Sequence, residues 1–265
     1  MTLRTCTKVN IGLNVLRKRP DGYHDLETLF VPYWGLGDTL EIEPADELSI
    51  TIEREGGVDW DPMQDLTVRA WRLLKADFPG LAPVSIRLQK GAPVGAGLGG
   101  GSADAAFMLR GLNELGSLGL SDASLASYAA RLGSDCAFFV YCHPMFATGR
   151  GEILEPFDID LSPYDLRVEI PLDPSGRPVA VSTREAYAGI VPRDNRRTLT
   201  TIPLREALRR PASEWRGIVV NDFEATVCPR HPQIQAKIDD FYGRGAVYAA
   251  MSGSGSAVFG LFPRK

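Results

Sequence analysis

The chain has 265 residues, a formal net charge of −4 and a hydrophobic content of 44%. This length suits one large domain or two modest ones, and the composition is that of a globular protein. Because no basic stripe is present, nucleic acid is not expected as the main partner, although a single nucleotide can still bind. The sequence contains no apolar run of 18 residues, and its first 16 residues do not resemble a signal peptide. We therefore expect a cytoplasmic protein with no membrane partner.

Cysteine and histidine show no metal-binding spacing. The four cysteines are scattered without a CxxC pair, and the three histidines do not combine with them into a ligand set. The expectation is a reduced protein without a bound metal.

Apolar periodicity predicts the elements of the first part of the chain. Residues 40–52 alternate around a polar turn and predict a β-hairpin, and residues 84–90 predict a further strand. Between them, residues 65–78 place apolar side chains at helical spacing.

Two helices and a strand are predicted next. A helix follows the glycine-rich stretch, with apolar positions from Ala105 to Leu115, and a second helix covers 121–132 behind a Ser-Asp cap. The apolar run CAFFVYC, 136–142, favours a strand. The proline-rich, acidic segment EPFDIDLSPYD is the candidate domain boundary near residue 155.

The pattern starts again after this boundary. It predicts a strand at 166–171, helices near 183–190, 203–210 and 231–242, and strands at 246–251 and 256–262.

The stretch PVGAGLGGGSADAA, 93–106, is the strongest chemical signal. Gly99, Gly100 and Gly101 come in succession and lead into the predicted helix. Such a turn presents backbone N–H groups and the positive end of a helix dipole, so it predicts a phosphate site. Ser102 caps the helix or turns its hydroxyl to a phosphate or a magnesium ion. The alternative is a tight turn with close helix packing. Three consecutive glycines cost backbone conformational entropy on folding, which disfavours this alternative.

Common phosphate loops do not fit this stretch. Gly95, Gly97 and Gly100 form GxGxxG, but Asp122, at the distance expected for a dinucleotide fold, lies at a helix start rather than at a strand end. No lysine precedes Ser102, so this is not a Walker A loop. The glycine loop of protein kinases joins two strands, whereas a helix is predicted after this stretch.

The full string PxGAGLGGGSAxAA resembles the central motif of the GHMP kinase superfamily (galactokinase, homoserine, mevalonate and phosphomevalonate kinases). TKVNIGLNV, 7–15, and MSGSGSAVFGLF, 251–262, resemble its N-terminal and C-terminal motifs, in the same order. The resemblance implies an α+β fold, with a ribosomal-S5-domain-2-like domain over 1–155, a ferredoxin-like domain over 156–265 and the active site between them. It implies ATP binding by Lys90, Asp65, Pro93, Val94, Gly95, Ala96, Gly97, Leu98, Gly99, Gly100, Gly101, Ser102 and Ala103.

Three of these ATP assignments have their own features. Lys90 matches a nucleotide-side lysine, the alternative being a solvated strand end. Asp65 stands where the superfamily members usually have asparagine, and Ala103 where a second serine is common.

The resemblance also implies a catalytic pair. Lys8 matches the active-site lysine and Asp135 the aspartate base, so the carboxylate would take the substrate proton while the lysine keeps it ionised. The alternatives are a surface charge for Lys8 and a helix cap for Asp135. However, a lone charge within a strand is costly. Asn10 shares the face of Lys8 on that strand and is assigned to the substrate.

RPDGYHDLETLF, 19–30, resembles the branch of the superfamily that phosphorylates the 2-hydroxyl of CDP-linked methylerythritol in the non-mevalonate isoprenoid route. Tyr23 offers a stacking face and His24 can hydrogen-bond a base edge, as cytosine recognition requires. The alternatives are a buried ring and a satisfied loop histidine. Thr183 and Tyr187 align with a threonine and a stacking aromatic, so that Tyr187 would sandwich the base with Tyr23, or they belong to a packed helix.

The sequence therefore predicts a small-molecule kinase with ATP as co-substrate and Mg²⁺ carried by ATP, acting as a monomer or weak homodimer. One rival is a different GHMP kinase, for homoserine or mevalonate, which the DGYH stretch disfavours. The other is a non-catalytic nucleotide-binding protein, which the presence of both Lys8 and Asp135 disfavours. NDFEATV, 221–227, is interpreted as structural support.

Overall fold

The computed structural model describes residues 1–195 and 202–264. The chain divides into two compact units that alternate along the sequence. The first unit comprises Met1–Lys8, Pro32–Val94 and Gly99–His143, and the second comprises Val9–Val31, Gly95–Leu98 and Pro144–Lys265. Each unit is built from separate segments of the chain, whereas the sequence predicts one domain boundary near residue 155. That boundary stays a prediction.

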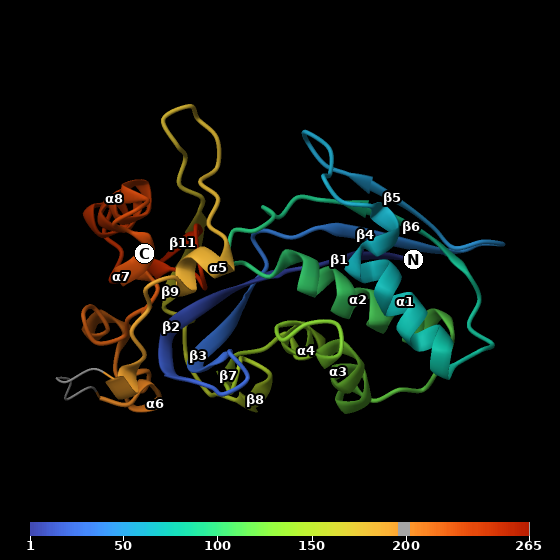
Figure 1. Cartoon of the computed structure of the whole chain (residues 1–265), viewed down its shortest axis with the longest axis horizontal. Coiled ribbons are helices and arrows are strands. Elements are labelled where there is room, and N and C mark those ends of the chain that lie inside the picture. The colour runs from blue at the N-terminus through green and yellow to red at the C-terminus, as the bar shows by residue number, and fades with distance from the viewer. Residues whose placement is uncertain (196–201, 265) are drawn as a thin grey trace. The chain divides into compact units, whose positions relative to one another are not determined.

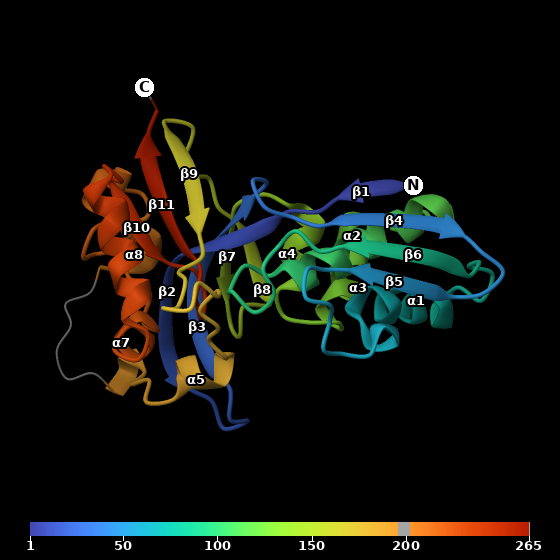
Figure 2. The ribbon, with the colours of Figure 1, turned by 90° about the horizontal axis from the view of Figure 1, so that it is seen from above.

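A four-stranded sheet forms the first unit's framework, in the order β1-β4-β6-β5 (Figure 2). Its strands are β1 (Thr2–Arg4), β4 (Thr39–Pro44), β6 (Val84–Gln89) and β5 (Ser49–Glu53). The predicted hairpin over 40–52 is wrong, because β4 and β5 lie on opposite edges of β6, antiparallel and parallel to it. Ile86 of β6 pairs with Ile42 on one side and Ile50 on the other, so the most buried strand occupies the centre.

Helices cover one face of this sheet (Figure 1). They are α1 (Leu66–Asp77), α2 (Gly100–Leu115), α3 (Asp122–Ala130) and α4 (Cys136–Tyr141), with a 3₁₀ turn at Pro62–Gln64 before α1. The first three confirm the predicted helices. The strand predicted at 136–142 is wrong. Because α4 packs against both α2 and α3, five of its six residues are buried, and a run that is apolar all round shows no helical period.

The second unit contains two further sheets. One has the order β2-β3-β7-β8, from β2 (Thr7–Lys18), β3 (His24–Tyr33), β7 (Met145–Thr148) and β8 (Ile153–Pro156), the first two strands also reaching into the first unit. The other is an antiparallel sheet of β10 (Tyr248–Met251), β11 (Val258–Pro263) and β9 (Tyr164–Glu169), in that order. These strands confirm the predictions after residue 155.

The long helix α8 (Pro232–Gly243) packs on β10 and β11 and buries Ile234, Ile238 and Phe241. The predicted helices near 183 and 203 are present but short, as α5 (Thr183–Tyr187) and α6 (Leu204–Ala207). The remaining turns are α7 (Glu224–Val227) and 3₁₀ segments at Arg193–Asn195 and Ala212–Glu214. Within the described part of the chain, no helix has the length and hydropathy needed to cross a membrane.

Candidate active site

Lys8 and Asp135 form an ion pair in the first unit, with Lys8 Nζ 3.6 Å from Asp135 Oδ2. The Lys8 side chain is only 5% exposed, whereas that of Asp135 is 31% exposed. Burial lowers the pKa of Lys8, and the charge of Asp135 opposes this shift. Lys8 is therefore not a surface charge. Asp135 immediately precedes α4 but makes no side-chain capping bond to it, so the alternative of a helix cap does not account for its partly exposed carboxylate.

The start of α2 lies beside this pair. Gly99 caps the helix with a left-handed backbone, φ +73°, and a Cβ there would come within 2.9 Å of the Phe139 ring and 3.4 Å of Lys8 Cε. Glycine is thus required both for the backbone angle and for the close approach. The first N–H groups of α2 and the ammonium of Lys8 occupy the same region, which is a favourable environment for a phosphate.

Ser102 and Asp65 both take part in local contacts. Burial raises the pKa of the Cys136 thiol, which adjoins Asp135, to about 11, and the Ser102 hydroxyl opposes this shift. Asp65 caps α1, accepting hydrogen bonds from the backbone N–H and the hydroxyl of Thr67 at 2.9 and 2.7 Å. The Asp65 side chain therefore has a structural partner at the position where the resemblance implied ATP binding.

Lys90 is buried between two carboxylates and is not a solvated strand end. Its Nζ donates to Asp38 and, at 2.6 Å, to Asp104 Oδ2, and all three side chains are at most 4% exposed. Burial acts to lower the pKa of Lys90, but the charges of Asp104 and Asp38 outweigh it and the pKa is raised. The pKa of Asp104 is raised by burial and by Asp38.

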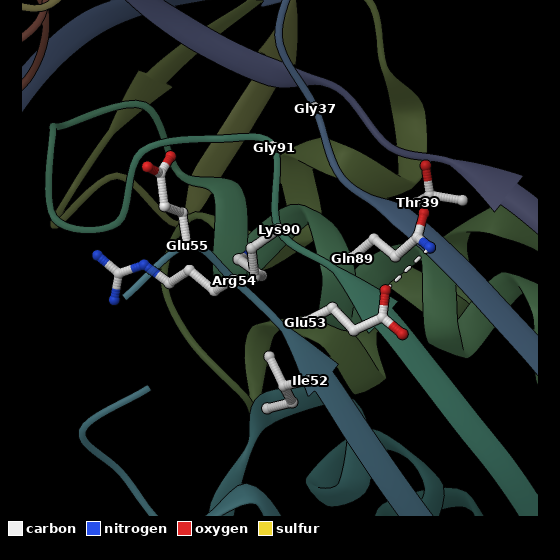
Figure 3. Close-up of a pocket in the computed structure, with 9 residues that line it drawn as sticks. All are labelled: Gly37, Thr39, Ile52, Glu53, Arg54, Glu55, Gln89, Lys90 and Gly91. Carbon is white, nitrogen blue, oxygen red and sulfur yellow. Dashed lines mark hydrogen bonds between the residues drawn. The ribbon is translucent and has the colours of Figure 1, made fainter. Parts of the chain in front are cut away.

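A pocket of about 680 Å³ opens beside Lys90 (Figure 3). Its lining comes from the start of β4, the end of β5 and the end of β6, and ends at Gly91, two residues before the glycine-rich stretch. Six of its nine lining residues are charged or polar, and the Gln89 amide donates to Glu53 at 3.1 Å. The lining residues are Gly37, Thr39, Ile52, Glu53, Arg54, Glu55, Gln89, Lys90 and Gly91.

In the second unit, Ser252 joins the three motifs of the sequence. Its hydroxyl accepts from the backbone N–H of Asn10 and donates to the carbonyl of Gly97, both at 3.2 Å. A Cβ on Gly97 would lie 2.3 Å from the Ser252 carbonyl oxygen, so the two loops touch through glycine backbone. Asn221 holds the C-terminal motif from the other side, donating to the carbonyls of Met251 and Gly253 at 2.8 Å.

Asn10 itself is buried, and its amide donates to the Thr28 hydroxyl at 3.1 Å. The amide therefore has a structural partner in addition to its predicted role toward the substrate.

Tyr23 projects from the turn between β2 and β3. Its side chain is 58% exposed, which excludes the alternative of a buried ring, and the guanidinium of Arg150 lies 4.9 Å from the ring centroid. The turn is closed by the Arg19 N–H donating to the Tyr23 carbonyl, with Gly22 at φ +87°. The backbone thus holds an aromatic face outward, available for stacking.

His24 stacks on Tyr187 with ring centroids 4.7 Å apart and planes 20° from parallel. Burial, assisted by Lys18, lowers the pKa of His24, so the imidazole is neutral at pH 7 and offers one donor and one acceptor. Tyr187 also meets Phe223 edge-on at 4.8 Å, and Thr183 lies 3.5 Å from the Ser254 hydroxyl. The structure thus brings Tyr187 to His24, whereas the predicted partner of Tyr187 was Tyr23.

Comparison with known proteins assigns the chain to a family. The family model described as GHMP kinases N terminal domain matches residues 65–143. A 4-diphosphocytidyl-2-C-methyl-D-erythritol kinase of Bacteroides fragilis is 47% identical over 258 residues, covering 96% of this chain and 89% of the relative. The chain belongs to the 4-diphosphocytidyl-2-C-methyl-D-erythritol kinase family.

More distant relatives agree with this assignment to the 4-diphosphocytidyl-2-C-methyl-D-erythritol kinase family. The enzyme of that name from Symbiobacterium thermophilum is 36% identical, with 99% of this chain and 91% of the relative covered. A crystal structure of 4-(cytidine 5'-diphospho)-2C-methyl-D-erythritol kinase superposes with a TM-score of 0.77 at 32% identity, covering 98% and 90% of the two chains. A homoserine kinase from Cytophaga hutchinsonii, at 17% identity and a TM-score of 0.67 over 100% and 86%, shares the fold. The GHMP kinase fold expected from the three motifs is confirmed.

Several site-forming residues escaped the sequence analysis. Asp38 and Arg150 stand in no motif that marks them, whereas Asn221 begins the segment NDFEATV, 221–227, that was interpreted as structural support. Asp104 offered a signal, because it is a charged residue among the alanines of α2. Cys6 and Cys142, scattered in the sequence, have their sulfur atoms 3.9 Å apart.

Proposed function

We propose that this protein transfers the γ-phosphoryl group of ATP to the 2-hydroxyl of 4-CDP-2-C-methyl-D-erythritol. The near-full-length similarity to kinases of that name, at up to 47% identity, carries the proposal. In this reaction the bond between the γ-phosphorus and the bridging oxygen of ADP breaks, a bond from the substrate oxygen forms, and the hydroxyl proton leaves. The products are ADP and the 2-phosphate.

Asp135 would accept that proton. Its carboxylate is 31% exposed and lies 3.6 Å from the buried ammonium of Lys8, which would screen charge that develops on the transferred phosphoryl group. Because Lys8 is held within β2, the pair is preorganised and needs no rearrangement at the moment of transfer.

ATP would occupy the first unit's pocket and the loop that follows it. The adenosine part would occupy the pocket of about 680 Å³, and the chain from Gly91 leads into the glycine loop, residues 93–103, and the start of α2. Phosphate oxygens would accept from N–H groups at that helix start. Lys90 and Asp65 lie on this nucleotide side, where Asp38 and Asp104 bind the Lys90 ammonium and Thr67 binds the Asp65 carboxylate.

Mg²⁺ would arrive with ATP as part of the nucleotide substrate. Across the described residues no group of three or more His, Cys, Asp or Glu side chains could hold a metal ion, which supports ligation mainly by the phosphates. Ser102, at the start of α2, is the hydroxyl nearest in sequence to the glycines and is the candidate protein ligand.

The second unit would supply the cytidine site. Tyr23 offers an exposed aromatic face, His24 a neutral imidazole and Tyr187 a second ring, while Thr183 and Asn10 offer polar groups to the rest of the substrate. Stacking of a base between aromatic rings, with an edge reader beside it, is a common mode of recognition for unpaired bases.

A direct comparison of substrates tests the proposal. ATP turnover is measured with CDP-methylerythritol, homoserine and mevalonate at matched concentrations. We expect turnover only with the CDP-alcohol. Turnover of homoserine or mevalonate in its place would assign the chain to another GHMP kinase activity, and ATP binding without any turnover would support a non-catalytic nucleotide-binding protein. A cytoplasmic location, the absence of nucleic-acid and membrane partners and a monomer or weak homodimer remain predictions from the sequence.

A further inference from the structure

Asp38, Lys90 and Asp104 form a buried polar cluster, here called the DKD cluster, within the first unit. Asp38 precedes β4, Lys90 follows β6, and Asp104 lies in the first turns of α2. Lys90 Nζ donates to one carboxylate oxygen of each aspartate. The Thr5 hydroxyl donates to the other oxygen of Asp104 at 3.4 Å.

The cluster also binds backbone. Oδ1 of Asp38 accepts from the N–H groups of Gly91 and Ala92, both at 2.7 Å. The backbones approach so closely that a Cβ on Gly91 would lie 2.6 Å from the Gly37 carbonyl oxygen. Four hydrogen bonds therefore hold residues 90–92: two from the Lys90 ammonium to Asp38 and Asp104, and two from the backbone N–H groups of Gly91 and Ala92 to Asp38.

Both ends of the glycine loop thus depend on the DKD cluster. Residues 90–92 enter the loop and are held by Asp38, while α2 leaves it and is held through Asp104. Gly100 stands between these ends, and a Cβ there would lie 3.2 Å from Ala92 Cβ, 3.7 Å from Asp38 Oδ2 and 4.0 Å from Lys90 Nζ. The salt bridges join the two ends across the base of the loop.

This arrangement leaves the Lys90 ammonium little capacity for a nucleotide. Its side chain is 4% exposed, and two carboxylates already neutralise it. A phosphate would have to compete with two buried carboxylates for the same ammonium, and pulling the lysine away would leave them unpaired.

We propose that the DKD cluster is a positioning device for the ATP loop, in which Lys90 acts by holding the two ends of the loop together and not by contacting the nucleotide. The inference rests on the proposed kinase function. It assigns Asp38 and Asp104, whose side chains are at most 2% exposed, an effect on ATP affinity. The physical basis is preorganisation, since a loop held in its binding geometry loses less entropy when ATP binds.

Asp104→Asn tests the proposal most cleanly. The substitution keeps the shape and removes the charge that holds Lys90, and Asp104 is 2% exposed, so any effect on ATP must pass through the cluster. We expect the dissociation constant of ATP, measured calorimetrically without the second substrate, to rise about tenfold. The KM for ATP should rise in parallel, whereas kcat at saturating ATP and the KM for the CDP-alcohol should change less than threefold.

Lys90→Met and the double variant decide between positioning and direct contact. If Lys90 acts by positioning, the double variant Lys90→Met with Asp104→Asn should bind ATP as tightly as Lys90→Met alone. If Asp104→Asn binds ATP as the parent does while Lys90→Met loses binding, Lys90 contacts ATP directly and the proposal is overturned. Equal losses for ATP and the CDP-alcohol would also overturn it, because they indicate general damage to the fold.

Two further variants control for folding. Lys75→Met removes a lysine that donates to the carbonyls of Pro79 and Leu81 at the end of α1, and it should leave ATP binding unchanged. Thr5→Val weakens the cluster more gently and should raise the ATP dissociation constant two- to fourfold; no change in a Thr5→Val protein that binds the CDP-alcohol normally would count against the proposal. A parent protein that binds no ATP would instead refute the proposed kinase function itself.

Discussion

The imidazole of His24 stacks on the ring of Tyr187, with centroids 4.7 Å apart. Both side chains belong to the second unit, His24 at the start of β3 and Tyr187 at the end of α5. A base inserted against Tyr187 on this face would take the place of the imidazole, which would then move to the edge of the base. Two of the rings assigned to cytosine recognition are therefore in contact with each other.

Tyr187 tests this arrangement. A base stacked on an aromatic ring contributes about 1–3 kcal/mol, so Tyr187→Ala should weaken binding of the CDP-alcohol roughly ten- to hundredfold. Tyr187→Phe keeps the ring and should bind within about threefold of the parent. Calorimetric titration of the three proteins with CDP-methylerythritol checks both values. Equal affinity of the alanine and phenylalanine variants would show that Tyr187 only packs against Phe223.

Tyr23 and His24 decide which base is accepted. Tyr23→Ala should weaken the CDP-alcohol by a similar factor and leave ATP binding unchanged. His24→Ala should reduce the preference for the CDP-alcohol over its UDP analogue, because the two bases stack alike but present different hydrogen-bonding edges. The comparison is kcat/KM for the two nucleotides in each protein. If the parent turns both over equally and Tyr23→Ala binds both normally, the DGYH turn is structural only.

Asp135→Asn separates proton acceptance from shape. The amide cannot take the proton of the substrate hydroxyl, so kcat should fall at least about 100-fold. ATP affinity and thermal stability should change little, since the Asp135 side chain is partly exposed and does not cap α4. Steady-state kinetics with parallel calorimetry give both quantities. Near-normal turnover of a folded variant would remove Asp135 from the chemistry.

Gly100→Val probes the start of α2. A Cβ at this position already lies 3.2 Å from Ala92, so a branched side chain must displace the entrance of the ATP loop. We expect ATP affinity to collapse, with a smaller loss for the CDP-alcohol. Gly80→Val, at an exposed glycine with open space around its Cβ position, serves as the matched control. Unchanged ATP binding by Gly100→Val would contradict a phosphate role for the loop.

Glu224 should make stability depend on pH. Burial raises the pKa of Glu224 from 4.5 to about 7, although the hydrogen bond from the Met251 N–H opposes this. Between pH 4.5 and about 7 the folded protein retains a proton on Glu224 that the unfolded chain has lost. The contribution of this proton to the free energy of unfolding is therefore complete below pH 4.5 and is lost as pH rises to about 7. The loss amounts to about 3 kcal/mol at 1.36 kcal/mol per pKa unit.

Urea unfolding at pH 5 and pH 8 measures this effect. Glu224→Gln keeps a neutral group at all pH values, so the fall in unfolding free energy between the two pH values should be smaller by about 2.5 kcal/mol than in the parent. Other titrating groups contribute equally to both proteins and cancel in the comparison. Identical pH profiles would show that Glu224 does not carry the dependence.

Local sequence was sufficient where one face of an element is apolar and the other polar. The helices α1 and α3 and the strand β6 follow directly from such alternation, and Ser121 caps α3 as predicted. The glycine motif, too, is local, because left-handed angles at Gly95, Gly97 and Gly99 are required by the turn itself. These features, with the order of the three motifs, identified the superfamily.

Tertiary structure alone decided the rest. CAFFVY became a helix because neighbours bury it on all sides, and β5 paired with β6 because β6 offers two edges to apolar strands. Lys90 pairs with Asp38 and Asp104, and His24 stacks on Tyr187, which lies 163 positions away in the sequence. Such pairings depend on how whole elements pack, so residue spacing along the chain does not predict them. The physical reason is that a charge or ring is placed by burial and by its partners, which only the folded chain supplies.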